Sequence, residues 1–327
     1  MGLPKIALIG AGQIGSRHLQ ALALINREIA LEVVDPSQHS LDITKERFAE
    51  VSRTSYVKSI RFLTELDNLS NMLDVVVVAT NADVRRAVLE KLLDNKKVKY
   101  LLLEKVLFQR IEDYHAIGEL MELKGVRAWV NCGRRMWPIY KTLKNKLNNN
   151  PKINYSISGS KIGLGCNSIH FLDTLAYLSR ESEFKLKFDQ LDSELVTCKR
   201  PGFVEFTGTL YGVSKKGSTL SITSYSEGNA PVVVTINSSE LCCIVKEGIG
   251  RTWISERSNN WQWEELIFDI PMQSRSTHLV IQQILDEGEC GLPGYKESAQ
   301  LHLPILSTLL EHYKYVKEEE TTICPIT

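Results

Sequence analysis

The stretch that most constrains the fold is residues 6–15, with the sequence IALIGAGQIG. A short apolar strand runs into Gly10-x-Gly12-x-x-Gly15, and a helix is expected to begin there. Gly10 permits a tight turn, Gly12 lets the backbone approach a pyrophosphate, and Gly15 lets helix and strand pack closely. The N–H groups and positive dipole end of the helix then face the phosphates. Taken alone, the three glycines also suit an ordinary loop between a strand and a helix.

A second apolar run, residues 29–34, ends at Asp35, which lies twenty residues beyond Gly15. With this acid in place, the whole unit is the dinucleotide-binding fingerprint of a Rossmann domain. A carboxylate accepts hydrogen bonds from the adenosine ribose hydroxyls but repels a 2′-phosphate, and residues 36–38 supply no Arg or Lys to receive one. The sequence therefore favours NAD(H) over NADP(H).

Composition narrows the class of protein further. At 327 residues the chain is long enough for two domains, each with its own core. Acidic and basic residues balance at 39 each, so we expect neither a nucleic-acid partner nor attraction to a membrane. Seven cysteines without C-x-x-C spacing indicate reduced thiols and a cytoplasmic protein. The histidines show no metal spacing, so no metal is expected.

Strand and helix alternate through the first part of the chain. Strands are expected at residues 59–63, 73–80 (LDVVVVAT), 98–103 (VKYLLL) and 126–130. Helices are expected at residues 41–51, 82–94 and 112–124, with a helical turn at 66–72. This order predicts a parallel doubly wound sheet in an NAD-binding Rossmann domain, residues 1–130.

Ligands of such sheets bind beyond the carboxyl ends of the strands. In this chain those ends carry the glycine turn, Asp35, the pair Thr80 and Asn81, and the pair Glu104 and Lys105. Cofactor contacts are accordingly expected from Gly10, Gly12, Gln13, Ile14, Gly15, Asp35, Thr80, Asn81 and Glu104.

The pattern changes after residues 148–151, Asn-Asn-Asn-Pro, which follow a helix expected at residues 138–147. A strand at residues 153–161 and a helix at about 168–178 come next. Alternating segments then occupy residues 203–213, 218–225, 231–236, 240–245, 251–255 and 261–268, and a helical stretch covers 277–315. Consecutive strands joined by Gly and Asn turns predict an antiparallel sheet in a second α/β domain, residues 131–327.

Several motifs together resemble the Gfo/Idh/MocA oxidoreductases, the family of glucose-fructose oxidoreductase and inositol dehydrogenase. They are GAGQIGSRH at residues 10–18, VVVVATN at 75–81, LLLEKV at 101–106, NCGRRMWP at 131–138 and NSIHFLD at 167–173. The resemblance covers most of the chain. It implies an N-terminal Rossmann domain, a C-terminal substrate-binding domain with an open, mostly antiparallel sheet, and a homodimer or homotetramer formed through that sheet.

The family's Glu-Lys-Pro motif falls on Glu104, Lys105 and Val106. The resemblance implies that Lys105 is catalytic, because an ammonium there would orient the reacting alcohol and stabilise a developing alkoxide. A solvated lysine that ends a strand is the alternative. Because a cis bond without proline costs about 3–4 kcal/mol, the Lys105-Val106 bond is expected to be trans.

The second catalytic residue that the resemblance implies is His170. On the expected helix it shares a polar stripe with Asp173. Asn167 or Ser168 suits the N-cap, which would put His170 in the first turn, where the positive helix end keeps the imidazole neutral. A solvated or structural histidine is the alternative that the stripe alone allows.

One position departs from the family pattern: Cys166 stands where the family has an Asp. A thiol with a pKa of about 8.5 is mainly neutral and does not replace a carboxylate. Either Asp173 or a substrate group takes over part of that role, or the reaction differs from that of better-known members.

The family's Arg-rich element implies that Arg134 or Arg135 lines the substrate cleft, with a surface or interdomain ion pair as the alternative. The expected substrate contacts are Lys105, Arg134, Asn167, His170 and Asp173. His18 is interpreted as a helix-packing residue.

These observations favour an NAD-dependent oxidoreductase that moves a hydride between nicotinamide and a hydroxyl or keto carbon of a sugar, polyol or nucleotide-linked sugar. Substrate would lie between the domains, with Lys105 and His170 around the reacting oxygen. The alternative is a non-catalytic NAD-responsive sensor or regulator of the same fold, which Cys166 favours and the two retained residues oppose. The substrate, the direction of reaction and the oligomer size are left open by the sequence.

Overall fold

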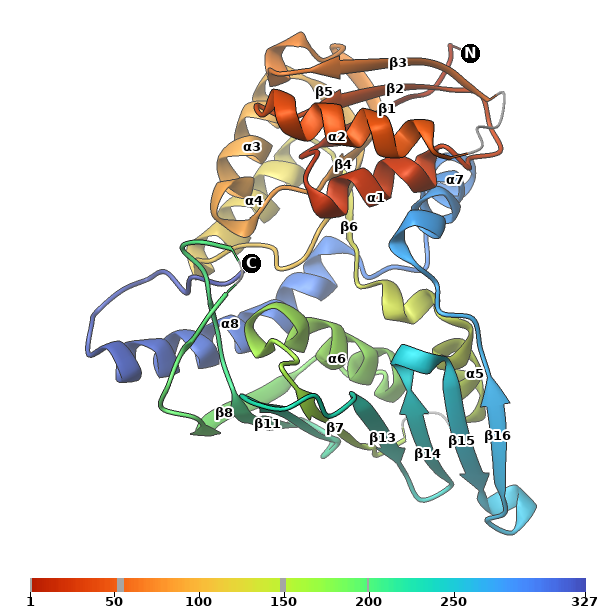
Figure 1. Cartoon of the computed structure of the whole chain (residues 1–327), viewed down its shortest axis with the longest axis vertical. Helices are drawn as coiled ribbons and strands as arrows, with labels where there is room; N and C mark the ends of the chain where they lie inside the picture. Colours follow the sequence, from red (N-terminus) through yellow and green to blue (C-terminus); the bar gives the residue numbers. More distant parts are fainter. Residues whose placement is uncertain (1, 52–55, 148–150, 199) are drawn as a thin grey trace. The chain divides into compact units, whose positions relative to one another are not determined.

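A computed structural model of the chain describes residues 2–51, 56–147, 151–198 and 200–327. Two compact units are present (Figure 1). The first holds Met1–Phe108, Glu112–Asn131 and Pro271–Lys296, and the second holds Gln109–Ile111, Cys132–Ile270 and Glu297–Thr327. With a single boundary after residue 130, the segment Pro271–Lys296 would belong to the second domain. It belongs to the first unit instead, because its helix packs on the first sheet.

The first unit is built on a six-stranded sheet in which every neighbouring pair is parallel. Its strand order, β3-β2-β1-β4-β5-β6, is that of the doubly wound dinucleotide-binding fold. The strands are β1 (Lys5–Ile9), β2 (Ile29–Val34), β3 (Val57–Leu63), β4 (Met72–Val78), β5 (Lys97–Leu103) and β6 (Arg127–Val130). Most side chains of β1, β4 and β5 are buried, as their apolar runs require. The predicted parallel sheet is confirmed.

The helices of this unit include one from the far end of the sequence. The first four are α1 (Gln13–Leu22), α2 (Gln38–Ala49), α3 (Ala82–Asn95) and α4 (Ile111–Leu123). The fifth, α7 (Thr277–Glu287), packs against α1 and β4. The single helical stretch expected over residues 277–315 is therefore wrong. Gly288 ends α7 in the left-handed conformation, with φ 72°, and a separate helix, α8 (Tyr295–Lys317), follows.

The second unit contains an eight-stranded sheet in the order β16-β15-β14-β13-β7-β12-β11-β8. The strands are β7 (Asn154–Ser160), β8 (Phe184–Leu191), β11 (Gly208–Ser214), β12 (Thr219–Tyr225), β13 (Val233–Asn237), β14 (Leu241–Lys246), β15 (Arg251–Glu256) and β16 (Trp263–Ile267). β7 and β12 are parallel and the other pairs are antiparallel, which confirms the mostly antiparallel sheet. Burial alternates along β12, β13 and β14, so one face of the sheet meets the core.

Two details of this unit differ from the sequence expectation. The strand expected at residues 203–213 is two strands, because Gly208 starts β11 in the left-handed region and a short β10 (Val204–Glu205) pairs with β9 (Val196–Thr197) instead. β8 is an additional strand. Of the breaker expected at residues 148–151, residues 148–150 lie outside the described residues.

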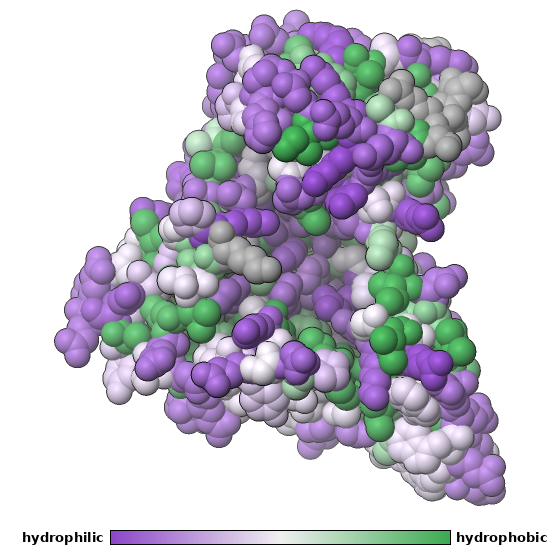
Figure 2. Space-filling model, in the orientation of Figure 1, coloured by the Kyte–Doolittle hydropathy of each residue, from purple (hydrophilic) through white to green (hydrophobic). Residues whose placement is uncertain are grey.

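Three helical elements lie before or beside this sheet: η2 (Gly133–Met136), α5 (Pro138–Lys146) and α6 (Leu164–Ser179). They contact one another, and α6 packs against β12. Apolar side chains remain exposed near the edge strand β16, among them Ile249, Trp263 and Ile267, and Figure 2 shows apolar residues gathered on that side of the unit. Within the described part of the chain, no helix combines the length and apolar character needed to cross a membrane.

Candidate functional site

Three glycines shape the turn between β1 and α1, and each has a different steric environment. Gly10 has φ 94°, and a Cβ there would lie 2.9 Å from the Ala79 carbonyl carbon. A Cβ on Gly15 would lie 1.8 Å from the Gly10 carbonyl oxygen, so helix and turn pack closely only with glycine there. A Cβ on Gly12, the N-cap of α1, would meet no described atom within 4 Å. Open space before the first N–H groups of a helix fits an anionic group such as a pyrophosphate.

Asp35 follows β2 and is tied to the same turn. Its Oδ2 accepts a hydrogen bond from the Ala11 N–H at 2.7 Å, and its Oδ1 accepts one from the Ser37 N–H at 2.8 Å. The residue is partly exposed, and each carboxylate oxygen has a second lone pair, so it retains the capacity to accept from ribose hydroxyls. Gln13 and Ile14, the first two residues of α1, are exposed.

Thr80 and Asn81 follow β4 at the same edge of the sheet. The Thr80 Oγ1 atom is buried and has no hydrogen-bond partner among the described residues. Because buried hydroxyls are normally hydrogen-bonded, this atom fits a polar group of a ligand. Asn81 is exposed and is the N-cap of α3.

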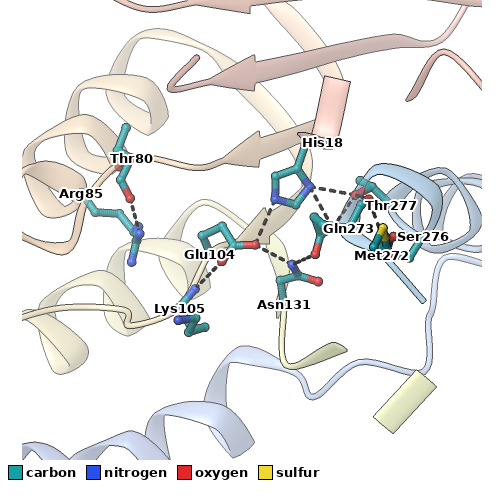
Figure 3. Close-up of polar contacts among 10 residues, drawn as sticks. All are labelled: His18, Thr80, Arg85, Glu104, Lys105, Asn131, Met272, Gln273, Ser276 and Thr277. Atoms are coloured by element: carbon teal, nitrogen blue, oxygen red, sulfur yellow. Dashed lines mark hydrogen bonds and ion pairs between the residues drawn. The ribbon is translucent and has the colours of Figure 1, made fainter. Parts of the chain in front are cut away.

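A buried polar network surrounds Glu104 at the end of β5 (Figure 3). Its Oε1 lies 2.9 Å from His18 Nε2 and accepts a hydrogen bond from Asn131 Nδ2 at 2.5 Å. Burial raises the pKa of Glu104, but His18, Lys105 and Asn131 outweigh burial and hold the pKa below its ordinary value. Glu104, expected to touch the cofactor, is therefore an ionised carboxylate engaged by the protein itself.

The segment Pro271–Lys296, which also belongs to the first unit, completes this network. His18 Nδ1 lies 2.8 Å from Thr277 Oγ1, and Gln273 donates both to Thr277 Oγ1 at 2.6 Å and toward His18 Nδ1 at 3.3 Å. Asn131 donates to the Gln273 side chain at 2.9 Å. The interpretation of His18 as a packing residue is thus incomplete: it is fully buried, but as a hydrogen-bonded link between α1, β5 and the start of α7.

Lys105 comes directly after this acid and is partly exposed. Its backbone N–H donates to Glu104 Oε2 at 3.2 Å. The Lys105-Val106 peptide bond is cis, so the expected trans bond is wrong. The expectation used only the local preference, whereas Val106 is buried and its carbonyl oxygen accepts a hydrogen bond from Arg85.

His170 lies on α6, but not where expected. The helix begins at Leu164, so His170 falls in its second turn rather than its first. The helix starts earlier because a residue far away in the sequence caps it. The Glu205 carboxylate, from β10, accepts hydrogen bonds from the N–H groups of Gly165 at 2.7 Å and Cys166 at 3.1 Å. The helix-end argument for a neutral imidazole is therefore wrong. His170 is partly exposed, and its carbonyl oxygen accepts an intrahelical side-chain hydrogen bond.

Asn167 and Cys166 lie in the first turn of α6 and are partly exposed. The Asn167 side chain donates to the Ile162 carbonyl oxygen at 2.6 Å. The Cys166 Sγ lies 3.6 Å from the Gly163 carbonyl oxygen. Both side chains therefore bind the loop that precedes the helix.

Arg134 and Arg135 form two separate ion pairs within the second unit, of which the pair of Arg135 with Asp173 is buried and that of Arg134 is partly buried. Arg135 binds Asp173 through two hydrogen bonds of 2.7 Å and contacts Glu297 at 2.8 Å. Arg134 binds Glu247 through two hydrogen bonds of 2.8 Å. Burial raises the pKa of Asp173 to about 6 against the opposing effect of Arg135. Two of the expected substrate contacts, Arg134 and Asp173, thus have protein partners for their charges.

The sequence did not identify two residues that hold the backbone near the candidate site, Arg85 and Glu205. For Arg85 a signal existed: it shares the helical spacing of Leu89 and Leu92, which are buried on α3, so a charge at that position faces the core. For Glu205 there was none, because it caps a helix far away in the sequence. Among the described residues, no group of three or more His, Cys, Asp or Glu side chains is arranged to hold a metal ion.

Comparisons with known proteins agree with this architecture. Residues 4–132 match the Gfo/Idh/MocA model, described as an oxidoreductase family with an NAD-binding Rossmann fold. A comparison with curated proteins gives no match.

Solved structures share the fold over almost the whole chain. A UDP-N-acetylglucosamine 3-dehydrogenase from Acidithiobacillus ferrooxidans is 14% identical, with a TM-score of 0.72, covering 97% of this chain and 100% of that one. A Gfo/Idh/MocA family oxidoreductase from Vibrio cholerae is 18% identical, with a TM-score of 0.70 and coverage of 97% and 100%. A super-repressor mutant of Gal80p from Saccharomyces cerevisiae is 15% identical, with a TM-score of 0.71 and coverage of 96% and 97%. The resemblance in the motifs is confirmed: residues 4–132 match the NAD-binding Rossmann domain of the Gfo/Idh/MocA oxidoreductase family, and the chain as a whole shares the fold of a solved structure from that family.

Proposed function

We propose that this chain is an NAD-dependent oxidoreductase that moves a hydride between a nicotinamide and a hydroxyl or keto carbon of a carbohydrate. One observation carries the proposal: the open space at Gly12, the unpartnered Thr80 hydroxyl and Lys105 follow β1, β4 and β5, which are neighbours in the sheet. Ligands of doubly wound sheets bind at that edge.

The glycine turn and the first N–H groups of α1 would hold the pyrophosphate of the cofactor. Asp35 would accept from the adenosine ribose, which favours NAD(H) over NADP(H), and the Thr80 hydroxyl would meet another polar group. When bound, NAD supplies the hydride acceptor.

Lys105 is the proposed hydrogen-bond donor to the reacting oxygen, because an ammonium stabilises the charge of a developing alkoxide. Ionised Glu104 supports this role, since its carboxylate accepts from the Lys105 backbone N–H. His170 is the proposed proton acceptor. We assign Arg134 and Asp173 to the stability of the second unit instead, because each already forms a bidentate ion pair, with Glu247 and Arg135 respectively, and has little capacity left for a ligand.

A regulator that binds NAD without turnover is the second candidate. It is supported by Cys166, a thiol where the resemblance implies a carboxylate, and by the fold shared with Gal80p. The dehydrogenase is preferred because Lys105 and His170 are both retained.

The deciding experiment follows absorbance of reduced nicotinamide after the protein is mixed with NAD and a panel of UDP-sugars, sugars and polyols. Nucleotide sugars come first because a dehydrogenase of this fold acts on UDP-N-acetylglucosamine. We expect at least one panel member to be oxidised. Silence across the panel together with tight NAD binding would support the regulator.

Four variants then test the residue roles. Lys105→Met and His170→Ala should each abolish turnover and leave NAD affinity nearly intact. Lys99→Met on β5 and His115→Ala on α4, both exposed, are the matched controls and should keep full turnover. Full turnover by either test variant would remove that residue from the mechanism.

We also expect a homodimer or homotetramer that uses the outer face of the second sheet. Exposed Trp263 and Ile267 on the edge strand β16 support an interface there. Light scattering of the eluted protein would give the assembly mass, and a monomer at micromolar concentration would contradict this proposal.

A further inference from the structure

Arg85, on α3, is among the largest fully buried side chains of the first unit, with 1% of its surface exposed. Its guanidinium joins two loops that follow the neighbouring strands β4 and β5, and Figure 3 shows its contact with the first of them, at Thr80. It donates to the carbonyl oxygen of Thr80 after β4. It also donates to the carbonyl oxygens of Val106 and Leu107 after β5, the second at 2.8 Å.

Burial of the Arg85 guanidinium costs free energy, because the charge loses its contact with water. Burial lowers the pKa of Arg85 to about 10, against the raising effect of nearby Glu104, so the side chain remains protonated at neutral pH. The position shares the buried face of α3 with Leu89 and Leu92, and an apolar residue would fill that face without desolvating a charge. What only arginine provides is a planar fork of five N–H donors that can reach separate backbone segments at once.

We propose that Arg85 is a positioning residue that holds the loop of Lys105 against the loop of Thr80. It donates to the backbone on both sides and is itself buried, so it acts through Lys105 rather than on substrate. The inference rests on the role proposed for Lys105 and adds the element that sets its place.

The test compares Arg85→Ala and Arg85→Lys with Arg86→Ala, all in the full chain. Arg86 is the next residue of α3, but it is partly exposed and pairs with Glu90 and Asp113, so it serves as the matched control. Hydrogen exchange, measured by mass spectrometry without substrate, follows the peptide that contains residues 104–108. We expect exchange there to quicken at least about tenfold in both Arg85 variants and to stay unchanged in Arg86→Ala. Lysine keeps the charge, but its single nitrogen lacks the fork that spans both loops.

Kinetics and rescue separate positioning from general stability. With a substrate from the panel, we expect Arg85→Ala to lose about 100-fold in kcat, while KM and the NADH dissociation constant stay within about threefold. Millimolar guanidinium should restore part of the kcat of Arg85→Ala. Because guanidinium is a denaturant, such a rescue would not come from general stabilisation.

Unchanged exchange at residues 104–108 in both Arg85 variants would overturn the inference, as would accelerated exchange with an unchanged kcat. The unaltered chain could show no turnover with any panel member while exchange still quickens in the Arg85 variants. In that case the proposed dehydrogenase function is wrong, but the role of Arg85 in holding the two loops together is supported. The exchange readout needs no turnover, so the two failures are distinguishable.

Discussion

The open space at Gly12 gives a sharp test of the cofactor site. Gly12→Ala adds a methyl group where no described atom lies within 4 Å, at a backbone φ of −68° that suits any residue. We expect the free energy of unfolding to be unchanged or raised by about 0.4–1 kcal/mol, because alanine restricts the unfolded chain. The same methyl would occupy the space proposed for the pyrophosphate. Loss of two charge-assisted hydrogen bonds of about 1.5 kcal/mol each corresponds to about 100-fold weaker NADH binding.

Gly15→Ala is the matched comparison, three residues along the same helix. Its Cβ would lie 1.8 Å from the Gly10 carbonyl oxygen, so the backbone must shift. We expect a loss of about 1–3 kcal/mol in stability, and a fall in melting temperature of about 2–4 °C for each kcal/mol.

The assay is a fluorescence titration with NADH and a thermal melt for both variants and the unaltered chain. The diagnostic pattern is lost affinity at an unchanged or raised melting temperature for Gly12→Ala, and a lowered melting temperature for Gly15→Ala. If Gly12→Ala bound NADH as tightly as the unaltered chain, the pyrophosphate would not lie at this helix end.

Three further predictions concern single carboxylates. Asp173→Asn takes one partner from buried Arg135, so we expect urea unfolding at pH 7 to show a loss of about 3 kcal/mol with NADH affinity unchanged; a loss of affinity alone would contradict this. The pKa of Glu104 is lowered in the folded chain from 4.5, so its stabilising contribution is complete above about pH 4.5 and is lost as the pH falls through the folded pKa. Glu104→Gln should therefore make the free energy of unfolding depend less on pH in the acidic range. An unchanged pH dependence would exclude this contribution. Asp35→Ala should weaken NADH binding about tenfold and NADPH binding less. Equal NADH and NADPH affinities in the unaltered chain would rule out the proposed preference.

Much of the N-terminal unit was predictable because its signals are local. Apolar runs such as residues 75–78 identify buried strands, and the glycine turn with Asp35 puts the proposed cofactor edge at the ends of β1 and β2. The antiparallel character of the second sheet also followed from alternation and turn residues. Each of these signals lies within a few residues of the backbone that it describes.

The tertiary structure decided the features made by residues far apart in the sequence. Glu205 caps α6 from another strand and shifts His170 into the second turn, and Arg85 reaches the carbonyl oxygen of Val106, 21 residues away. His18 meets Thr277 across 259 residues. A sequence pattern reports the period and chemistry of neighbouring side chains, and so it determined the fold class and the resemblance of residues 4–132 to the Gfo/Idh/MocA family, and it led to the proposed cofactor edge. Buried hydrogen bonds across such separations depend on how the chain folds back on itself, and only the tertiary structure supplies them.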